Sequence, residues 1–311
     1  GIRGLSWNCD GKKLASASSD ATVKVWSMDQ HRDGKEAELK HGHGVEQAKW
    51  HPSVPNVLAT CSTDKTARIW DIRSKSKASV LNGKSDFIAV SWNHDGNYLA
   101  LGDKSDLVTV VDVRTQETVA SRSFKDNFWV NELMWWRNSN FFLMATGQSR
   151  QNHNQDLAHG GFEIVEFGLA SRSLESRSTL WGHTAQCLCL AKDSGERFLA
   201  TGGCDALVCL WDADDMACVQ TWSCEDEVNQ VSFNHDGTLL AAVAAGIPDI
   251  FIWHTESREA IPPLHVSSTP SAVAWHPSQL ALAYANQPAS RGGDRSSSRD
   301  SSTASITVVS F

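Results

Sequence analysis

The sequence lacks the features of a membrane-spanning or disulfide-bonded protein. Its longest apolar run, Leu239 to Ile247, is far shorter than the roughly 18 residues that a membrane span requires. The eight cysteines include no C-x-x-C pair and no cluster with histidine of the metal-binding type. Cys187 and Cys189 alternate with leucine as small core residues do. We therefore read the cysteines as free buried thiols in a reducing compartment, and we expect no membrane contact.

Catalytic and nucleic-acid-binding signatures are also scarce. The chain contains no G-x-S-x-G, no H-E-x-x-H and no phosphate-binding glycine loop. Its net charge of −8 disfavours a surface that grips phosphates everywhere, although a local basic patch stays open. We expect a protein that is not an enzyme and that uses no cofactor, no metal ion and no small-molecule substrate.

Tryptophan is abundant, with 13 copies against only 2 tyrosines, and it recurs at a regular interval. Large aromatic residues in such number indicate a big core or a repeated structural slot. The intervals between successive members of the series are 43, 42, 43, 98 and 42 residues, and the long interval contains one further unit at 184–203. The sequence therefore predicts seven units. The series consists of Trp7, Trp50, Trp92, Trp135, Phe233 and Trp275.

Each unit contains three short alternating segments and a less regular fourth one, which predicts an all-β fold. The Asp-Gly pairs at 10–11, 95–96 and 236–237 occur where a tight hairpin requires positive φ. Two of these pairs belong to the tetrapeptide Asn-His-Asp-Gly, at 93–96 and 234–237. We interpret both tetrapeptides as hairpin turns rather than parts of an active site, because His94 and His235 would lie about three units apart.

Units of 42–43 residues that carry Gly182-His183 and the pairs Trp70-Asp71 and Trp211-Asp212 resemble WD40 repeats. The resemblance implies a seven-bladed WD40 β-propeller of four-stranded blades. It also implies a buried structural quartet in units two and five, in which histidine, threonine, aspartate and the indole N–H satisfy one another. The quartet residues are His41, Thr60, Asp64 and Trp70, and then His183, Thr201, Asp205 and Trp211.

Longer runs resemble one branch of that family, the third subunits of the THO complex (the Tex type). The most distinctive runs are GDKSDLVTVVD at 102–112 and FLATGGCDALVCLWD at 198–212. The resemblance implies a nuclear, non-catalytic scaffold in THO (TREX) that couples transcription to mRNP assembly and mRNA export. Its implied partners are the other THO subunits, which are large helical scaffold proteins, and RNA contact through the assembly stays open.

Two other functions stay open at this stage. A substrate receptor of a cullin-type ubiquitin ligase carries a Trp-Asp-x-Arg ending, which residues 70–73 provide. That tetrapeptide is common among such repeats, because arginine there also suits the turn between strands. A reader of histone tails or phosphopeptides would need a charged ring at the mouth of the central channel, and we assemble no such ring from the sequence.

We expect residues 1–311 to form a single propeller with two insertions. Residues 148–160 would form an inserted loop in blade 4, and residues 286–304 a disordered Ser/Arg/Gly-rich loop in blade 7. The seventh blade would lack its outer strand, which the family places before the first unit, so we expect a trimmed chain. Both insertions would emerge on the same face, since each connects a second strand to a third.

Four aromatic residues are candidates for binding a protein partner. Phe128 and Trp129 precede the first strand expected in unit four, outside the repeat slots, in what we expect to be a loop. The pair could equally fold back and cap the blade. Trp136 and Trp222 are weaker candidates, and Trp136 could exchange with neighbouring Trp135 as the core residue.

Overall fold

The computed structural model describes residues 1–28, 34–74, 78–125, 128–137, 139–148, 159–286 and 305–311. Every regular element in these ranges is a β-strand, and all strand pairs are antiparallel. No described segment forms a helix that is long and apolar enough to cross a membrane. The all-β prediction is confirmed.

The strands form seven separate sheets, six with four strands and one with three. We call these sheets blades 1 to 7 in chain order. Blades 1 and 2 contain β1 (Ile2–Trp7), β2 (Lys13–Ser18), β3 (Thr22–Ser27), β4 (Gly34–Lys40), β5 (Val45–Trp50), β6 (Val57–Ser62), β7 (Thr66–Asp71) and β8 (Ala78–Asn82). Blades 3 and 4 contain β9 (Phe87–Trp92), β10 (Tyr98–Asp103), β11 (Leu107–Asp112), β12 (Thr118–Ser123), β13 (Phe128–Trp136), β14 (Phe141–Gln148), β15 (Gly160–Gly168) and β16 (Ser173–His183). Blades 5 to 7 contain β17 (Cys187–Lys192), β18 (Phe198–Gly203), β19 (Leu207–Asp212), β20 (Ala217–Ser223), β21 (Val228–Phe233), β22 (Leu239–Ala244), β23 (Asp249–His254), β24 (Ala260–His265), β25 (Pro270–Trp275), β26 (Ala281–Asn286) and β27 (Ile306–Ser310).

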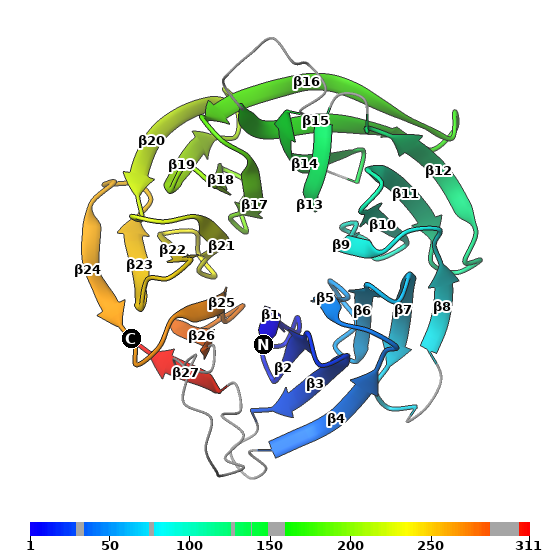
Figure 1. Ribbon diagram of the computed structural model, residues 1–311, viewed down its shortest axis with the longest axis horizontal. Helices are drawn as coiled ribbons and strands as arrows, with labels where there is room; N and C mark the ends of the chain where they lie inside the picture. The colour runs from blue at the N-terminus through cyan, green and yellow to red at the C-terminus, as the bar shows by residue number, and fades with distance from the viewer. Residues whose placement is uncertain (29–33, 75–77, 126–127, 138, 149–158, 287–304) are drawn as a thin grey trace, which may run out of the picture.

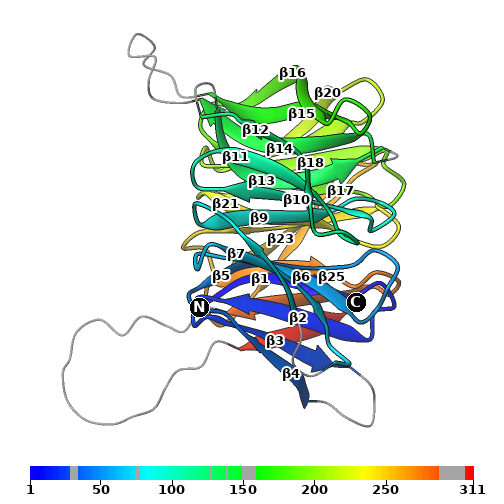
Figure 2. The same ribbon diagram turned by 90° about the vertical axis from the view of Figure 1, so that its right-hand side faces the viewer.

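The blades are arranged radially around a central axis (Figure 1). The first strand of each blade is innermost, and each inner strand contacts the inner strand of the next blade, with β25 contacting β1 to close the ring. Viewed from the side, the strands run roughly along the axis of the ring (Figure 2). The seven-bladed prediction is therefore confirmed, and in the described residues the sheet of blade 7 has three strands, as expected.

Hydrogen bonds from the recurring tryptophan join neighbouring blades. In four blades its indole N–H donates to a backbone carbonyl of the preceding inner strand, which favours tryptophan over other large apolar residues there. The bond is not made by Phe233 of blade 6 or by Trp275 of blade 7, whose buried Nε1 has no partner among the described residues. The bond from Trp7 to Ala274 joins the first blade to the last. The bonds are Trp7 Nε1 to the Ala274 carbonyl (3.1 Å), Trp50 to Ser6 (2.9 Å), Trp92 to Lys49 (2.9 Å) and Trp135 to Ser91 (3.0 Å).

The repeated Asn-His-Asp-Gly segments form hairpin turns. In blade 3, the amide of Gly96 donates to the carbonyl of Asn93, and the Asn93 side chain accepts from the amide of Tyr98. Gly96 has a φ of 72°, which favours glycine. The ring of His51, from blade 2, covers this glycine so closely that an added Cβ would lie 1.9 Å from His51 Nε2. The turn therefore also serves as a contact between blades.

The two expected insertions fall largely outside the described residues. Residues 149–158 lie between β14 and β15, and residues 287–304 lie between β26 and β27. Each insertion does connect a second strand to a third. The proposal that both emerge on the same face follows from the antiparallel order of the strands in blades 4 and 7.

Candidate functional site

In blade 2, the residues proposed as a quartet meet in one hydrogen-bonded chain. His41 lies after β4 and its Nδ1 is 3.0 Å from the Asp64 carboxylate. Its Nε2 is 2.8 Å from the hydroxyl of Thr60, to which the indole of Trp70 donates at 2.9 Å. The imidazole tautomer with its proton on Nδ1 satisfies every one of these groups. Thr60 is fully buried.

Blade 5 repeats this arrangement, with a tryptophan that is more deeply buried than in blade 2. His183 Nδ1 lies 2.9 Å from Asp205, and its Nε2 lies 2.7 Å from the Thr201 hydroxyl. The indole N–H of Trp211 donates to the same hydroxyl at 3.0 Å. Trp211 is 3% exposed, whereas Trp70 is only half-buried. Loss of the threonine hydroxyl should therefore lower the free energy of unfolding more in blade 5 than in blade 2.

The electrostatics of blade 2 favour a neutral histidine and an ionised aspartate. Burial lowers the pKa of His41, and the nearby positive charge of Arg68 lowers it further. Burial acts to raise the pKa of Asp64, but hydrogen bonds from Thr66 and from the amide of Gly42 outweigh it and hold that pKa well below its ordinary value. The pair therefore stays in the protonation state that the hydrogen-bonded chain requires.

The chemistry of both quartets is structural. The threonine hydroxyl that would have to act as a nucleophile is fully buried in each blade and already bonds both a histidine and a tryptophan. The same arrangement occurs twice, in blades separated around the ring. We therefore assign these residues to holding the second and third strands of each blade to the segment that precedes its inner strand.

The prediction of a loop before unit four is wrong, because Phe128 and Trp129 are the first two residues of β13. The backbone of Phe128 pairs with Gln148 and that of Trp129 with Gly147, so the ladder of blade 4 extends farther than the repeat pattern indicated. The side chain of Phe128 lies outside the described part of the chain, while that of Trp129 is half-buried. Trp129 keeps a partly accessible indole.

Trp136 and Trp222 are held by their neighbours more than the sequence suggested. Trp136 is 5% exposed, which corrects its reading as a projecting anchor. It does not exchange with Trp135, because both are buried in different clusters on the two sides of blade 4. Trp222 is half-buried and stacks on Trp253 at 4.9 Å between ring centroids.

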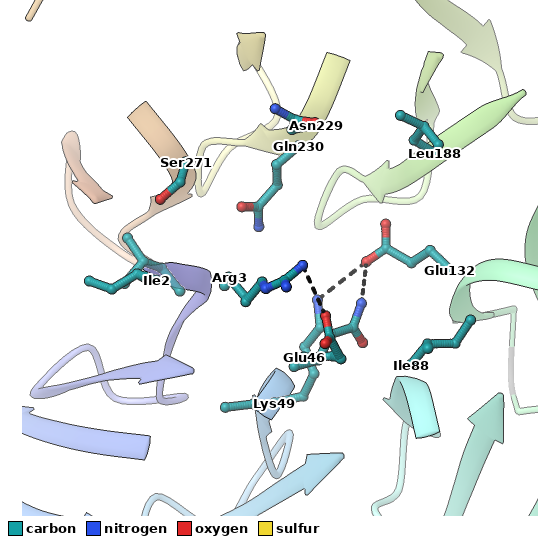
Figure 3. A pocket seen from close by; sticks show the side chains of 14 residues that line it. Ile2, Arg3, Glu46, Lys49, Ile88, Glu132, Leu188, Asn229, Gln230 and Ser271 are labelled. Carbon is teal, nitrogen blue, oxygen red and sulfur yellow. Dashed lines mark hydrogen bonds and ion pairs between the residues drawn. The ribbon is translucent and has the colours of Figure 1, made fainter. Parts of the chain in front are cut away.

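The inner strands enclose a central channel with a cavity of about 300 Å³ (Figure 3). Its charged side chains have both signs and pair across it, with Arg3 3.5 Å from Glu46 and Lys49 3.6 Å from Glu132. The pairing leaves no ring of one sign among the lining residues. The lining comprises Ile2, Arg3, Gly4, Leu5, Glu46, Gln47, Ala48, Lys49, Ile88, Glu132, Leu188, Asn229, Gln230 and Ser271.

Glu132 connects three blades through the channel. One carboxylate oxygen accepts from the Gln47 side chain of blade 2 at 3.3 Å, and the other accepts from the backbone amide of Leu190 in blade 5 at 2.8 Å. The side chain of Gln47 in turn accepts from the amide of Val90 in blade 3. Sequence analysis missed these contacts, because no local pattern marks which inner-strand polar residue faces the axis.

Two further features were not predicted. On the side of the disc that carries the turns between first and second strands, blades 3 to 5 surround a hollow of about 540 Å³ lined by Trp92, Trp135 and Trp136. The cysteines are also not uniformly buried, because Cys9 and Cys218 are exposed. Within the described residues, no group of three or more His, Cys, Asp or Glu side chains is placed to hold a metal ion.

Comparison with known families supports the architecture. A profile described as "WD domain, G-beta repeat" matches residues 1–27, 36–71 and 174–212. These segments contain β1 to β3, most of β4, β5 to β7, nearly all of β16, and β17 to β19, and they include both quartets. The fold and the repeats define a WD40-repeat β-propeller.

Two relatives are similar over most of the chain, and a third is similar over about half of it. THO complex subunit 3 of Arabidopsis thaliana is 33% identical over 290 residues, which cover 91% of this chain and 86% of that protein. The WD repeat-containing protein AAC3 of Dictyostelium discoideum is 30% identical over 305 residues, or 90% of this chain and 60% of that protein. Coronin-2A of Homo sapiens is 30% identical over 164 residues, covering 49% of this chain and 31% of that protein. The chain belongs to the WD40-repeat family that includes THO complex subunit 3.

Proposed function

We propose that this chain is a non-catalytic scaffold subunit of a nuclear THO (TREX) complex and takes part in mRNP assembly and mRNA export. The observation that carries the proposal is the 33% identity to a THO complex subunit 3 over 86% of that protein's length. The propeller supports it physically, because the polar side chains of its quartets are occupied in holding the blades together and its rim offers a rigid platform.

The proposed partners are the other THO subunits, which the family resemblance describes as large helical proteins. Trp129 is the proposed contact residue, with Phe128 beside it in sequence. A half-buried indole on a strand held by a long ladder is a rigid anchor that loses little conformational freedom on binding. Trp222 is the matched comparison, since it is also half-buried but is stacked on Trp253 in blade 6.

The alternative function as a cullin-ligase receptor rests on Arg73, and the geometry gives it little support. The guanidinium donates two hydrogen bonds to Asp71 in its own turn, at 3.0 and 2.6 Å. The arginine therefore has a local role that requires no ligase. We keep the ligase as an outcome of the test and not as a second proposal.

Affinity purification of the tagged chain from nuclear extract tests the function. Recovery of several THO subunits in stoichiometric amounts supports it, whereas recovery of a cullin adaptor in their place would overturn it. Trp129→Ala and Trp222→Ala then test the site. We expect the first variant to lose THO subunits and the second to retain them, with both folded by circular dichroism. Full recovery by Trp129→Ala would remove this residue from the interface while leaving the function intact.

A further inference from the structure

Two cysteines of blade 5 lie side by side at the rim of the propeller. Cys209 is in β19 and fully buried, while Cys218 is in the outermost strand β20 and exposed. The strand register pairs Trp211 with Cys218 and Cys209 with Thr221. Because alternate residues of a strand share a face and paired residues lie on the same face, both thiols project from one side of the sheet.

A register shift brings the two thiols together. Leu210 pairs with Gln220 and Trp211 with Cys218, so Val219 is an extra residue that bulges from β20. The bulge places Cys218 opposite Trp211, two positions from Cys209 on the same face of the sheet, so the two thiols are diagonal neighbours. A hydrogen bond between the two side chains is the largest influence on the pKa of each. The Cys209 sulfur also lies 3.5 Å from the carbonyl of Gly182.

The shared hydrogen bond makes the two thiols chemically different. Donation from Cys209 stabilises the Cys218 thiolate and lowers the pKa of Cys218 to about 7. The same bond, together with burial, raises the pKa of Cys209 far above its ordinary value. At neutral pH roughly half of Cys218 is therefore thiolate, while its buried neighbour keeps its proton.

The other cysteines do not share this combination. Cys187 and Cys189 are buried, and burial raises the pKa of each thiol. Cys9 is exposed, but burial of its sulfur and the neighbouring charge of Asp10 raise its pKa. Cys9 is thus a natural control for exposure without activation.

We propose that Cys218 and Cys209 form a peroxide-sensitive dithiol that closes to a disulfide between β19 and β20. The Cys218 thiolate attacks one oxygen of hydrogen peroxide and breaks the O–O bond, so that Cys218 becomes a sulfenic acid and hydroxide leaves and is protonated to water. The Cys209 sulfur then attacks the sulfenic sulfur, and its proton leaves with the displaced hydroxyl as a second water molecule. Two thiols are oxidised, one peroxide is reduced to two water molecules, and a reducing thiol reverses the change.

The disulfide would alter the rim of blade 5. It would attach the outermost strand covalently to its neighbour in a ten-residue loop, 209–218. It would also remove the thiol hydrogen that Cys209 shares with the carbonyl of Gly182, the residue before His183 of the quartet. Oxidation therefore couples Cys218 to the end of β16, the outermost strand of blade 4, independently of the proposed THO function.

Mass spectrometry of the purified, fully reduced chain tests the proposal. After treatment with hydrogen peroxide and alkylation of the remaining thiols, a protease that cleaves before aspartate cuts at Asp212, Asp214 and Asp215 and so separates the two cysteines. We expect one disulfide-linked pair of peptides, lost on treatment with dithiothreitol. In the reduced chain, Cys218 should be alkylated about tenfold faster than Cys9 near pH 7.

Three variants make the result decisive. Cys218→Ser should abolish the linkage. Cys209→Ala should instead accumulate a Cys218 sulfenic acid that dimedone traps, and should alkylate several-fold more slowly because the thiolate has lost its donor. Cys9→Ser should behave as the parent chain. Equal alkylation rates for Cys9 and Cys218, or oxidation of Cys218 in the parent chain without linkage to Cys209, would overturn the proposal.

Discussion

Replacing Thr201 by valine tests the role of the quartet most directly. Valine keeps the shape and strand preference of threonine but removes the hydroxyl that lies 2.7 Å from His183 Nε2 and 3.0 Å from Trp211 Nε1. Each buried polar group left without a partner costs about 1–3 kcal/mol. With two such groups, the free energy of unfolding should fall by roughly 2–6 kcal/mol.

The equivalent change in blade 2 should cost less. Thr60→Val leaves His41 Nε2 buried without a partner, but the half-buried indole of Trp70 can turn to water. We expect a loss of about 1–3 kcal/mol, smaller than the loss in the Thr201 variant. Thr221→Val, at an exposed position of blade 5, is the control and should change stability by less than about 0.5 kcal/mol.

Urea denaturation followed by circular dichroism measures all three variants under the same conditions. The loss of free energy of unfolding should be largest in Thr201→Val, smaller in Thr60→Val and smallest in Thr221→Val. If the Thr201 variant proves no less stable than the Thr221 variant, the quartet contributes nothing to stability. If Thr60→Val costs more than Thr201→Val, the argument from the exposure of the two indoles is wrong.

Two further predictions concern pH and a turn. Because the folded chain holds the pKa of His41 below its ordinary 6.5 and that of Asp64 below 3.8, the unfolded chain binds more protons on acidification. The urea concentration at the unfolding midpoint should therefore be highest above pH 6.5. It should decline as the pH falls, first as His41 becomes protonated and then as Asp64 does. A midpoint that rises on acidification would contradict the assignment of a neutral His41 and an ionised Asp64. Gly96→Ala should cost more than the roughly 1–2 kcal/mol of the left-handed backbone, because its Cβ would meet His51. Gly246→Ala, at the same φ of 72° but with only a flexible carboxylate nearby, should show the backbone cost alone, and equal losses in the two variants would exclude the clash.

Much of the fold could be predicted because its signals are local. Two-residue alternation marked the strands, and the Asp-Gly pairs marked turns whose glycines, Gly11, Gly96 and Gly237, have φ of 72°, 72° and 74°. The regular interval between tryptophans predicted seven blades. The quartets followed from the resemblance to WD40 repeats, since their members are far apart in sequence.

The errors at the candidate site have a common cause. Phe128 and Trp129 break the repeat pattern, so the pattern placed them in a loop, yet the backbone opposite them in β14 extends the ladder to meet them. Two consecutive tryptophans at 135 and 136 suggested that only one could be core. In a sheet packed on both sides, consecutive residues face opposite neighbours, and both are buried.

The sequence by itself determined that the chain forms seven short antiparallel sheets, because strand alternation, turn glycines and repeat length act within a few dozen residues. Only the tertiary structure decided which distant groups meet. Trp7 reaches Ala274 across the closure, Glu132 reaches Leu190 in the next blade, and Cys209 reaches Cys218 across a bulge. These contacts depend on how blades stack and how strands shift in register, and a pattern read along one strand carries no information about either.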